Sequence, residues 1–354
     1  MYLKHLVLRN FRNYHEAEIS FSPKLNAICG DNGQGKTSLL EAIFLISTGR
    51  SFRTEHLNEL ICEGSPFFYL EAEIVKDNVT QTVKMSFDGQ NRRLQLNAND
   101  FSTFQPLLGL LPSVLSAPND IDLIVGAPTK RRRFLNLHLA QSDPLYVHYF
   151  TRYWRAMKQR NCLLRSKSLD AIECWETEMA SAAAYLSRLR QGLIEEIREP
   201  LAIQSRRLSS EAETVELRLH SSYSGETEIY FQQLQKQRHR EKEFGFTLNG
   251  PHRDDLSFWL GSRLARDFAS EGQKKTAVTA LRLAEWERLS LKVGEMPLMA
   301  IDDFGWPLDA GRQMLFKKSL QSMGQVFLTT PGAFKSDEPC LVHSVINGSV
   351  TSEI

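Results

Sequence analysis

The chain has 354 residues, 42% of them hydrophobic and 24% charged, and a formal net charge of +1; this is the composition of an ordinary globular protein with two or three domains and excludes a disordered or fibrous one. No stretch approaches eighteen uncharged apolar residues, and Lys4 and Arg9 interrupt the apolar start, so we expect no membrane-spanning helix, no signal peptide and a cytoplasmic location. The five cysteines form no C-x-x-C pair and are odd in number, which favours reduced thiols over a disulfide framework or a zinc site.

The first hundred residues alternate apolar and polar side chains over several short runs. Strict alternation is typical of half-buried strands, so these runs predict an antiparallel β layer on an α/β core. The runs are "LKHLVLRNF", "AEISFS", "FYLEAEIVKD", "QTVKMSFDG" and "RRLQLNAND".

A phosphate-binding loop lies between these runs, in "GDNGQGKTS". Gly30, four further residues, then Gly35, Lys36 and Thr37 follow an apolar run and precede apolar residues at helical spacing. Backbone N–H groups of such a loop surround phosphate oxygens, the lysine reaches the β- and γ-phosphates, and the hydroxyl can bind Mg²⁺. A glycine-rich turn before an ordinary helix is the alternative interpretation.

Basic charge is concentrated in the middle of the chain. Residues 129–244 contain 20 lysines and arginines against 15 aspartates and glutamates, whereas the rest of the chain is net acidic. Each basic run could be a solvated helix face, but three of them together favour a polyanionic partner. The densest runs are "KRRR" from Lys130, the series Arg152, Arg155, Lys158, Arg160, Arg165, Lys167, and "KQRHREK" from Lys236.

The same region has helical periodicity. One apolar series runs from Tyr146 to Leu164, and a second runs from Ile172 to Ile197 in steps of three and four. The second series is close to a heptad repeat, but it lasts only about three and a half heptads. We therefore expect a short antiparallel helical hairpin or bundle, and no long coiled-coil arm.

The last region returns to strands and helices, and "PLMAIDD" ends an apolar run in Asp302 and Asp303. Asp302 is suited to a metal site, and Asp303 is placed to polarise an attacking water. Because Asp302 lies 266 residues after Lys36, we expect a large insertion within one ATPase core. The predicted division is an N-terminal half of the head at 1–128, a basic helical lobe at 129–244 and a C-terminal half of the head at 245–354.

A second anion site is predicted at "ASEGQKKT". Ser270, Gly272 and Gln273 open a helix about thirty residues before Asp302, and a helix N-terminus with a hydroxyl and a glycine favours an anion. Since the chain already has one phosphate loop, we expect this site to meet a γ-phosphate held by a second copy. A capped surface helix is the alternative.

The set "GDNGQGKTS", "ASEGQKKT", "LMAIDDFGWPLD" and "QVFLTT" resembles the SMC-like branch of the ABC ATPases. The additional motifs "FRNY", "GRSFR", "KRRRFLN", "KQRN" and "GPHRDDL" resemble the bacterial DNA replication and repair members of that branch. The resemblance implies an ABC-type α/β ATPase head with an antiparallel β layer and an inserted, mainly helical lobe. It also implies ATP and Mg²⁺ as cofactors, weak DNA-dependent ATP hydrolysis and an ATP-dependent homodimer. The same resemblance implies binding to gaps and single-strand/duplex junctions. It further implies recombinase loading with RecR- and RecO-type mediators and a link to the SOS response.

Carried over residue by residue, the resemblance assigns catalytic roles to Lys36, Asp302 and Asp303, and metal binding to Thr37 and Asp302. The signature Ser270, Gly272 and Gln273 would contact ATP in trans. ATP would be bound by Gly30, Asp31, Asn32, Gly33, Gln34, Gly35, Lys36 and Thr37.

The chain departs from the family pattern at four places. Asp303 stands where many ABC ATPases have Glu, which fits slow hydrolysis, and Glu271 stands where the family often has Arg, so Lys274 or Lys275 would have to compensate its charge. The loop "GWPLD" ahead of Asp309 is less polar than usual. No histidine follows "QVFLTT", so Thr329 or Thr330 would fill the usual histidine position.

Two rival functions remain open at this stage. A transporter-type or metabolic P-loop enzyme would be stimulated by a small molecule and indifferent to DNA. A structural SMC-like protein that holds chromosomes would need a longer heptad region. We also expect that Arg131, Arg132 and Arg133, or the face from Arg152 to Lys158, contact DNA phosphates.

Overall fold

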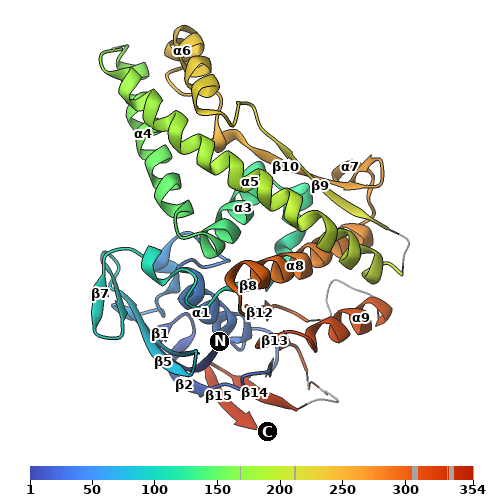
Figure 1. Cartoon of the computed structure of the whole chain (residues 1–354). Coiled ribbons are helices and arrows are strands. Elements are labelled where there is room, and N and C mark those ends of the chain that lie inside the picture. The colour runs from blue at the N-terminus through green and yellow to red at the C-terminus, as the bar shows by residue number, and fades with distance from the viewer. Residues whose placement is uncertain (168, 211–212, 305–309, 333, 335–338, 354) are drawn as a thin grey trace. The chain divides into compact units, whose positions relative to one another are not determined.

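The computed structural model describes residues 1–167, 169–210, 213–304, 310–332, 334 and 339–353. The chain forms two compact units, each of which has its own sheets and helices (Figure 1). Unit 1 comprises Met1–Ile121, Gln204–Ala212 and Glu271–Ile354, and unit 2 comprises Asp122–Ile203 and Glu213–Ser270. Unit 2 thus begins earlier and ends later than the expected lobe at 129–244. It extends past residue 244 because the strand at Asp255–Leu260 pairs with the strand at Val215–His220 within that lobe.

The first sheet of unit 1 is the expected antiparallel layer. Buried and partly exposed residues alternate along its central strand β4, as the sequence pattern predicted. The strand order is β2 (Tyr14–Ser20), β1 (Tyr2–Phe11), β4 (Phe68–Lys76), β5 (Val79–Phe87), β6 (Arg92–Leu96) and β7 (Asn99–Phe101).

The second sheet of unit 1 is parallel except for one edge strand. All four residues of β12 are buried, which explains why this strand is an unbroken apolar run in the sequence. The strand order is β15 (Ser349–Glu353), β14 (Cys340–Ile346), β3 (Leu25–Cys29), β13 (Val326–Thr330), β12 (Leu298–Ile301) and β8 (Ser113–Ser116), with β15 antiparallel to β14.

Helix α1 (Lys36–Thr48) contacts β1 and β4 of the first sheet and β8 and β13 of the second, so it lies between the two sheets. Nearly every residue of α1 is buried, in keeping with its apolar sequence. Helix α8 (Glu271–Val293) packs against β8. The other helices of this unit are α9 (Ala310–Leu320) and the 3-10 turns η1 (Leu57–Leu60), η2 (Gln105–Leu107) and η3 (Pro118–Ile121).

Unit 2 is built on the expected antiparallel hairpin of α4 (Tyr146–Ser166) and α5 (Ile172–Leu208). The Tyr149 and Tyr185 rings stack 4.1 Å apart, and Arg160 pairs with Glu176, so positions further along α4 meet earlier positions of α5. The expected apolar positions are buried at Tyr153, Met157, Leu164, Met179, Leu186, Leu193 and Ile197.

A small antiparallel sheet completes unit 2, in the order β11 (Arg263–Leu264), β10 (Asp255–Leu260) and β9 (Val215–His220). The remaining elements of this unit are α2 (Asp122–Val125), α3 (Pro128–Ser142), α6 (Thr227–Phe244), η4 (Pro251–Arg253) and α7 (Ala265–Phe268). Within the described part of the chain, no helix is both long enough and apolar enough to span a membrane.

Candidate functional site

The loop from Gly30 to Thr37 connects β3 to α1 and requires glycine at two positions. Gly30 has a φ of 146°, and a Cβ placed on it would lie 2.4 Å from the Val345 carbonyl oxygen. Gly35 has a φ of 122°, and its Cβ would lie 2.6 Å from Asn13 Nδ2. Since real Cβ atoms do not approach other atoms this closely, the close packing of the loop depends on glycine at both positions.

Two hairpin turns hold the same loop in place. From the β1–β2 turn, Asn13 Nδ2 donates to the Gln34 carbonyl at 2.9 Å, and Tyr14 Oη donates to the Gly35 carbonyl at 3.0 Å. From the β14–β15 turn, Asn347 N donates to Gln34 Oε1 at 2.7 Å. Burial raises the pKa of Tyr14, so its hydroxyl remains a donor at any physiological pH. The loop geometry is therefore fixed by residues that a search for the motif alone does not find.

The side chains of Lys36 and Thr37 donate hydrogen bonds to different kinds of oxygen: backbone carbonyls for Lys36 and a carboxylate for Thr37. Lys36 is buried, and its Nζ donates to the carbonyl oxygens of Gly30 and Asp31 at 2.7 and 2.8 Å. Thr37 Oγ1 donates to Asp302 Oδ1 at 2.9 Å. The structure thus brings together Thr37 and Asp302, which are 265 residues apart in the sequence.

Asp302 follows directly after β12 and accepts a second hydrogen bond, from Thr329 Oγ1 at 2.9 Å. Thr329 Oγ1 in turn accepts from the backbone N–H of Asp303 at 2.7 Å. Burial, with a smaller contribution from the charge of Asp303, raises the pKa of Asp302. A hydroxyl and a buried carboxylate are oxygen ligands of the kind that Mg²⁺ prefers, so Thr37 and Asp302 fit a magnesium ion.

A cavity of about 580 Å³ opens beside this group of residues. Its lining includes the loop residues Asn32, Gly33, Gly35, Lys36 and Thr37, together with Asp303. A volume of this size falls within the range of ligand-binding clefts.

The cavity lining also includes Arg12, Asn13 and Arg53, which the sequence reasoning did not propose as site residues. Arg12 is fixed by the fully buried Glu41, which accepts from its Nε at 2.9 Å and from its Nη2 at 2.8 Å. Arg53 Nη1 approaches the same carboxylate at 3.5 Å. Both arginines belong to motifs that carry the family resemblance: Arg12 lies in "FRNY" and Arg53 in "GRSFR". These motifs could have indicated them as site residues.

The residues of the expected second anion site start α8. Gly272 and Gln273 lie in its first turn, and neither is among the described residues that line the cavity beside Lys36. The side chain of Glu271 is largely exposed, and Lys275 Nζ lies 2.8 Å from it; the hydrogen bond from this lysine lowers the pKa of Glu271. Lys275 therefore provides the compensating charge that the sequence required. Ser270 precedes α8 and is exposed, and the "GWPLD" loop at 305–309 lies outside the described residues.

Comparisons with known proteins agree on the family. A family model described as the RecF/RecN/SMC N terminal domain matches residues 2–333. The DNA replication and repair protein RecF of Protochlamydia amoebophila is 44% identical over 337 residues, covering 93% of this chain and 94% of the relative. The chain belongs to the RecF family. RecF of Chlamydia caviae is 38% identical, with 92% and 90% coverage, and RecF of Bacillus cereus strain B4264 is 31% identical, with 100% and 99% coverage.

Solved structures of RecF share the fold over the whole chain. The structure of the recombination mediator protein RecF with ATP in the RecFOR pathway has a TM-score of 0.91 at 28% identity, and covers 100% of this chain and 98% of that one. An SMC head bound to the C-winged helix domain of ScpA has a TM-score of 0.59 at 17% identity, which shows the fold alone. The expected ABC ATPase head of the SMC-like type is thereby confirmed.

The motif "KRRRFLN" binds the motif "GPHRDDL" within unit 2, through Arg131 and Asp255. Arg131 of "KRRRFLN" is only 4% exposed and donates to both carboxylate oxygens of Asp255, at 2.6 and 3.0 Å. Arg190 donates to Asp254 at 2.6 Å and is also buried. The expectation that Arg131 contacts DNA phosphates is therefore wrong, because its guanidinium is buried and already binds Asp255.

The basic series on α4 is likewise divided between interior and surface. Arg160 is fully buried and binds Glu176 and Glu241, whereas Arg152 binds Glu178 through two hydrogen bonds, at 2.6 and 2.7 Å. Arg155 and Lys158 are exposed. Only the exposed members of this series can face a polyanion.

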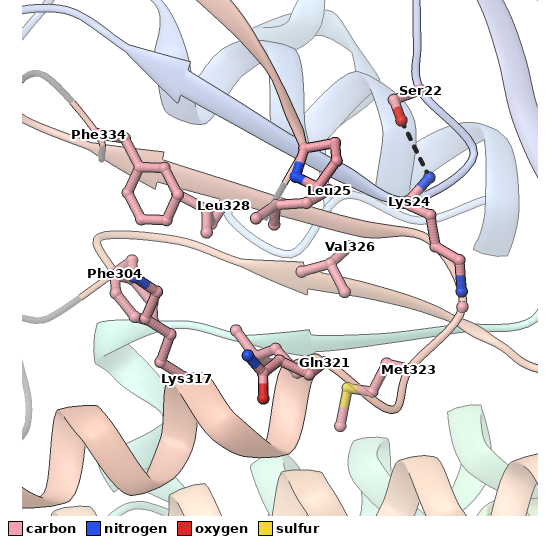
Figure 2. Close-up of a pocket in the computed structure, with 13 residues that line it drawn as sticks. Ser22, Lys24, Leu25, Phe304, Lys317, Gln321, Met323, Val326, Leu328 and Phe334 are labelled. Carbon is pink, nitrogen blue, oxygen red and sulfur yellow. Dashed lines mark hydrogen bonds between the residues drawn. The ribbon is translucent and has the colours of Figure 1, made fainter. Parts of the chain in front are cut away.

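A second cavity in unit 1, of about 260 Å³, is lined in part by Phe304, the residue after Asp303 (Figure 2). Its lining is mainly apolar, with Phe304, Leu328 and Phe334 at one end and Met323 and Gln321 at the other. None of its described lining residues also lines the cavity beside Lys36. Of the two cavities, only the one beside Lys36 has residues of the loop from Gly30 to Thr37 among its described lining residues.

Proposed function

We propose that this chain is an ATP-dependent DNA-binding protein of recombinational gap repair and replication maintenance. It binds single-strand/duplex junctions as an ATP-gated dimer in the cytoplasm and promotes recombinase loading, and slow ATP hydrolysis resets the dimer. Membership of the RecF family supports the repair role, and the solved RecF complex with ATP supports ATP as the nucleotide. The hydrogen bond between Thr37 and Asp302 is the observation that carries the proposal, because it joins the two halves of a nucleotide site.

In the proposed mechanism, the backbone N–H groups of residues 30–37 surround the phosphates of ATP, and the start of α1 adds positive potential. Lys36 exchanges its two carbonyl partners for the β- and γ-phosphate oxygens. Thr37 and Asp302 would hold Mg²⁺, which would supply positive charge to offset the charge that develops on the phosphates. Asp303, which lines the cavity, orients the attacking water.

The signature residues Ser270, Gly272 and Gln273 act on the ATP of a second copy. Gly272 and Gln273 are not among the described residues that line the cavity beside Lys36, which supports a contact with the ATP of a second copy. Mixing two variants tests it: Lys36→Met abolishes ATP binding, and Ser270→Arg blocks docking onto the partner's γ-phosphate. Lys36→Met alone should not hydrolyse ATP because it does not bind it, and Ser270→Arg alone should lose hydrolysis by on the order of 10²-fold or more.

The mixture should recover ATPase activity and ATP-dependent dimer, because one composite site combines an intact Lys36 with an intact Ser270. If Ser270→Arg alone weakens ATP binding to the monomer as much as Lys36→Met does, the signature does not act in trans.

The proposed partners are gapped DNA and mediators of the RecR and RecO type, in line with the RecFOR pathway named for the solved relatives. ATP hydrolysis measured without DNA, with duplex and with gapped DNA, at two salt concentrations, tests the DNA dependence. We expect the highest rate with gapped DNA and a smaller stimulation at high salt. A rate that is the same in all three conditions would contradict a DNA-dependent ATPase.

A further inference from the structure

Two phenylalanines lie exposed at the end of α6 in unit 2. The side chains of Phe244 and Phe246 are 53% and 38% exposed, and their ring centroids are 6.0 Å apart. Gly245 between them adopts a left-handed conformation with a φ of 75° and ends the helix. Aromatic rings cost free energy when they stay in water, so an exposed pair suggests a binding surface.

Arginines flank both rings. The guanidinium carbon of Arg240 lies 5.9 Å from the Phe244 ring centroid, and that of Arg253 lies 5.7 Å from the Phe246 centroid. Arg165 Nε donates to the Gly245 carbonyl at 3.4 Å from α4. Arg165, Arg240 and Arg253 are all exposed, so three exposed cations flank the pair of rings.

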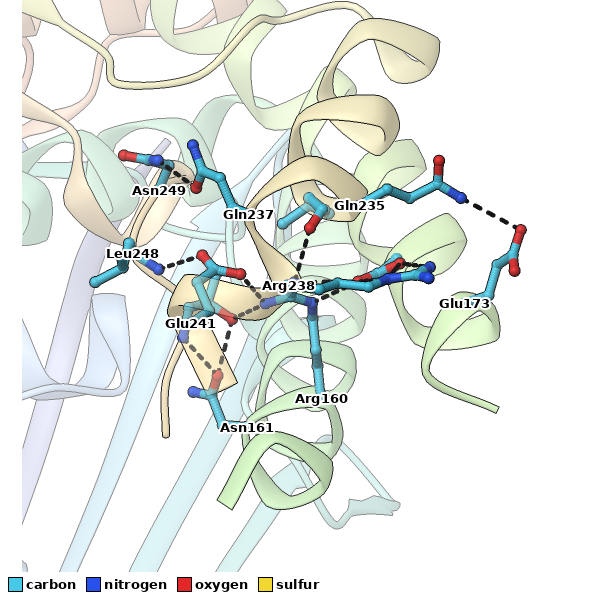
Figure 3. A network of polar contacts seen from close by, with 12 residues as sticks. Arg160, Asn161, Glu173, Gln235, Gln237, Arg238, Glu241, Leu248 and Asn249 are labelled. Atoms are coloured by element: carbon cyan, nitrogen blue, oxygen red, sulfur yellow. Dashed lines mark hydrogen bonds and ion pairs between the residues drawn. The ribbon is translucent and has the colours of Figure 1, made fainter. Parts of the chain in front are cut away.

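A buried network of polar contacts fixes the turn between Phe244 and Phe246. Figure 3 shows this network around Arg160 and Glu241. Glu241 Oε1 accepts from Leu248 N at 2.7 Å, and Asn161 Oδ1 accepts from Thr247 N at 2.8 Å. Glu241 is itself held by Arg160, with both side chains fully buried and 2.7 Å between Nη1 and Oε2. Because the turn is anchored on both sides of Gly245, little conformational entropy remains to be lost when a ligand binds the rings.

We propose that Phe244 and Phe246, with Arg165, Arg240 and Arg253, form a stacking surface for unpaired bases of single-stranded DNA. Aromatic rings stack on bases of any sequence, and neighbouring arginines bind the phosphates between them. Paired bases are already stacked inside a duplex, so exposed rings serve only an unpaired strand. This inference rests on the proposed DNA-binding function, and it assigns the single-strand side of a junction to this patch.

Fluorescence of a 2-aminopurine base in a short single strand reports stacking directly. We expect the full-length protein to quench this fluorescence and Phe244→Ala/Phe246→Ala to lose the quenching, with single-strand affinity reduced at least about tenfold. Ile229→Ala is the matched control, since Ile229 is a 49% exposed apolar residue on the same helix. The control should behave like the unchanged protein, and all variants should keep the same circular dichroism spectrum.

Binding to fully duplex DNA, measured in parallel, separates this inference from the proposed function. Duplex affinity should be nearly unchanged in the double variant. Quenching that persists in the double variant would overturn the stacking surface while leaving DNA binding intact, and no binding to any DNA by the unchanged protein would overturn both. Loss of binding to a mediator protein, with quenching retained, would assign the patch to a protein partner and so also overturn the proposal.

Discussion

Replacing Arg131 by Met tests whether the basic run "KRRR" serves the fold or the DNA. Arg131 donates to both oxygens of Asp255 and to two backbone carbonyls, of Leu123 at 3.3 Å and Gly126 at 2.8 Å. Methionine fills a similar volume but makes none of these bonds. The replacement therefore leaves the Asp255 carboxylate without its cation and the two carbonyls without one of their donors.

The expected cost follows from the burial of the pair. Removing one partner of a buried ion pair costs about 3–5 kcal/mol, because the remaining charge is left uncompensated. The Asp255 side chain is 33% exposed and stays partly hydrated, so we expect a loss near the lower limit, about 3 kcal/mol. Lys130→Met is the matched control, since the Lys130 side chain is 50% exposed and its ion pair with Asp122 spans 3.9 Å, an arrangement worth about 0–1 kcal/mol.

Urea unfolding followed by circular dichroism measures the stability, and fluorescence anisotropy at several salt concentrations measures DNA binding. For Arg131→Met we expect a lower unfolding midpoint and an unchanged slope of log affinity against log salt. For Arg155→Ala and Lys158→Ala, which remove exposed charges, we expect no change in stability and a slope reduced by about 0.9 for each DNA phosphate that the side chain neutralised. A normal midpoint together with a reduced slope for Arg131→Met would refute the structural role of this arginine.

Two further predictions concern buried groups. Burial lowers the pKa of His252 to about 4, so the unfolded chain takes up a proton before the folded one, and stability should fall as pH drops from 6.5 towards 4. Urea midpoints across this window should fall less for His252→Gln, and equal declines would contradict the prediction. Asp302→Asn keeps an oxygen to accept from Thr37 and Thr329 but removes a buried charge, so it should raise the midpoint measured without nucleotide while lowering the hydrolysis rate by roughly 10²-fold or more. A lower midpoint, or hydrolysis at the normal rate, would show that this carboxylate does not have the role assigned to it.

The meeting of Thr37 and Asp302 could be predicted from the sequence because one physical rule decides it. Asp302 follows directly after β12, and the loop from Gly30 to Thr37 leaves the carboxyl end of β3 in the same parallel sheet. Such strand ends share an edge, so the two residues meet there. The end of the inserted unit could not be predicted in this way. The helical periodicity within 129–244 predicts no strand there, and periodicity contains no information on which strands pair. The pairing of β9 with β10, together with contacts such as Thr247 with Asn161, joins the segment after residue 244 to unit 2.

The buried arginines were missed for a different reason. A run of basic residues is recognised from their neighbouring positions in the sequence. Whether each side chain is buried depends instead on the face of the helix on which it lies. Arg160 follows Met157 by three residues and precedes Leu164 by four, so it lies on the apolar face of α4, and the sequence pattern was sufficient to show this. Its partners Glu176 and Glu241 could not be inferred, because they come from two other helices.

The formal charge of residues 129–244 is therefore larger than the positive charge that this region presents at its surface. Arg131 and Arg190 are neutralised by Asp255 and Asp254, which lie outside that range, and Arg160 is neutralised inside the core. Substituting the densest basic run would thus disturb folding before it disturbed binding. In the proposed function, exposed cations such as Arg155, Lys158 and those beside Phe244 and Phe246 bind the DNA phosphates. Buried pairs such as Arg160 with Glu176 and Glu241 hold the helices α4 and α6 that carry several of these cations, so we expect the buried arginines to determine where the exposed ones meet DNA.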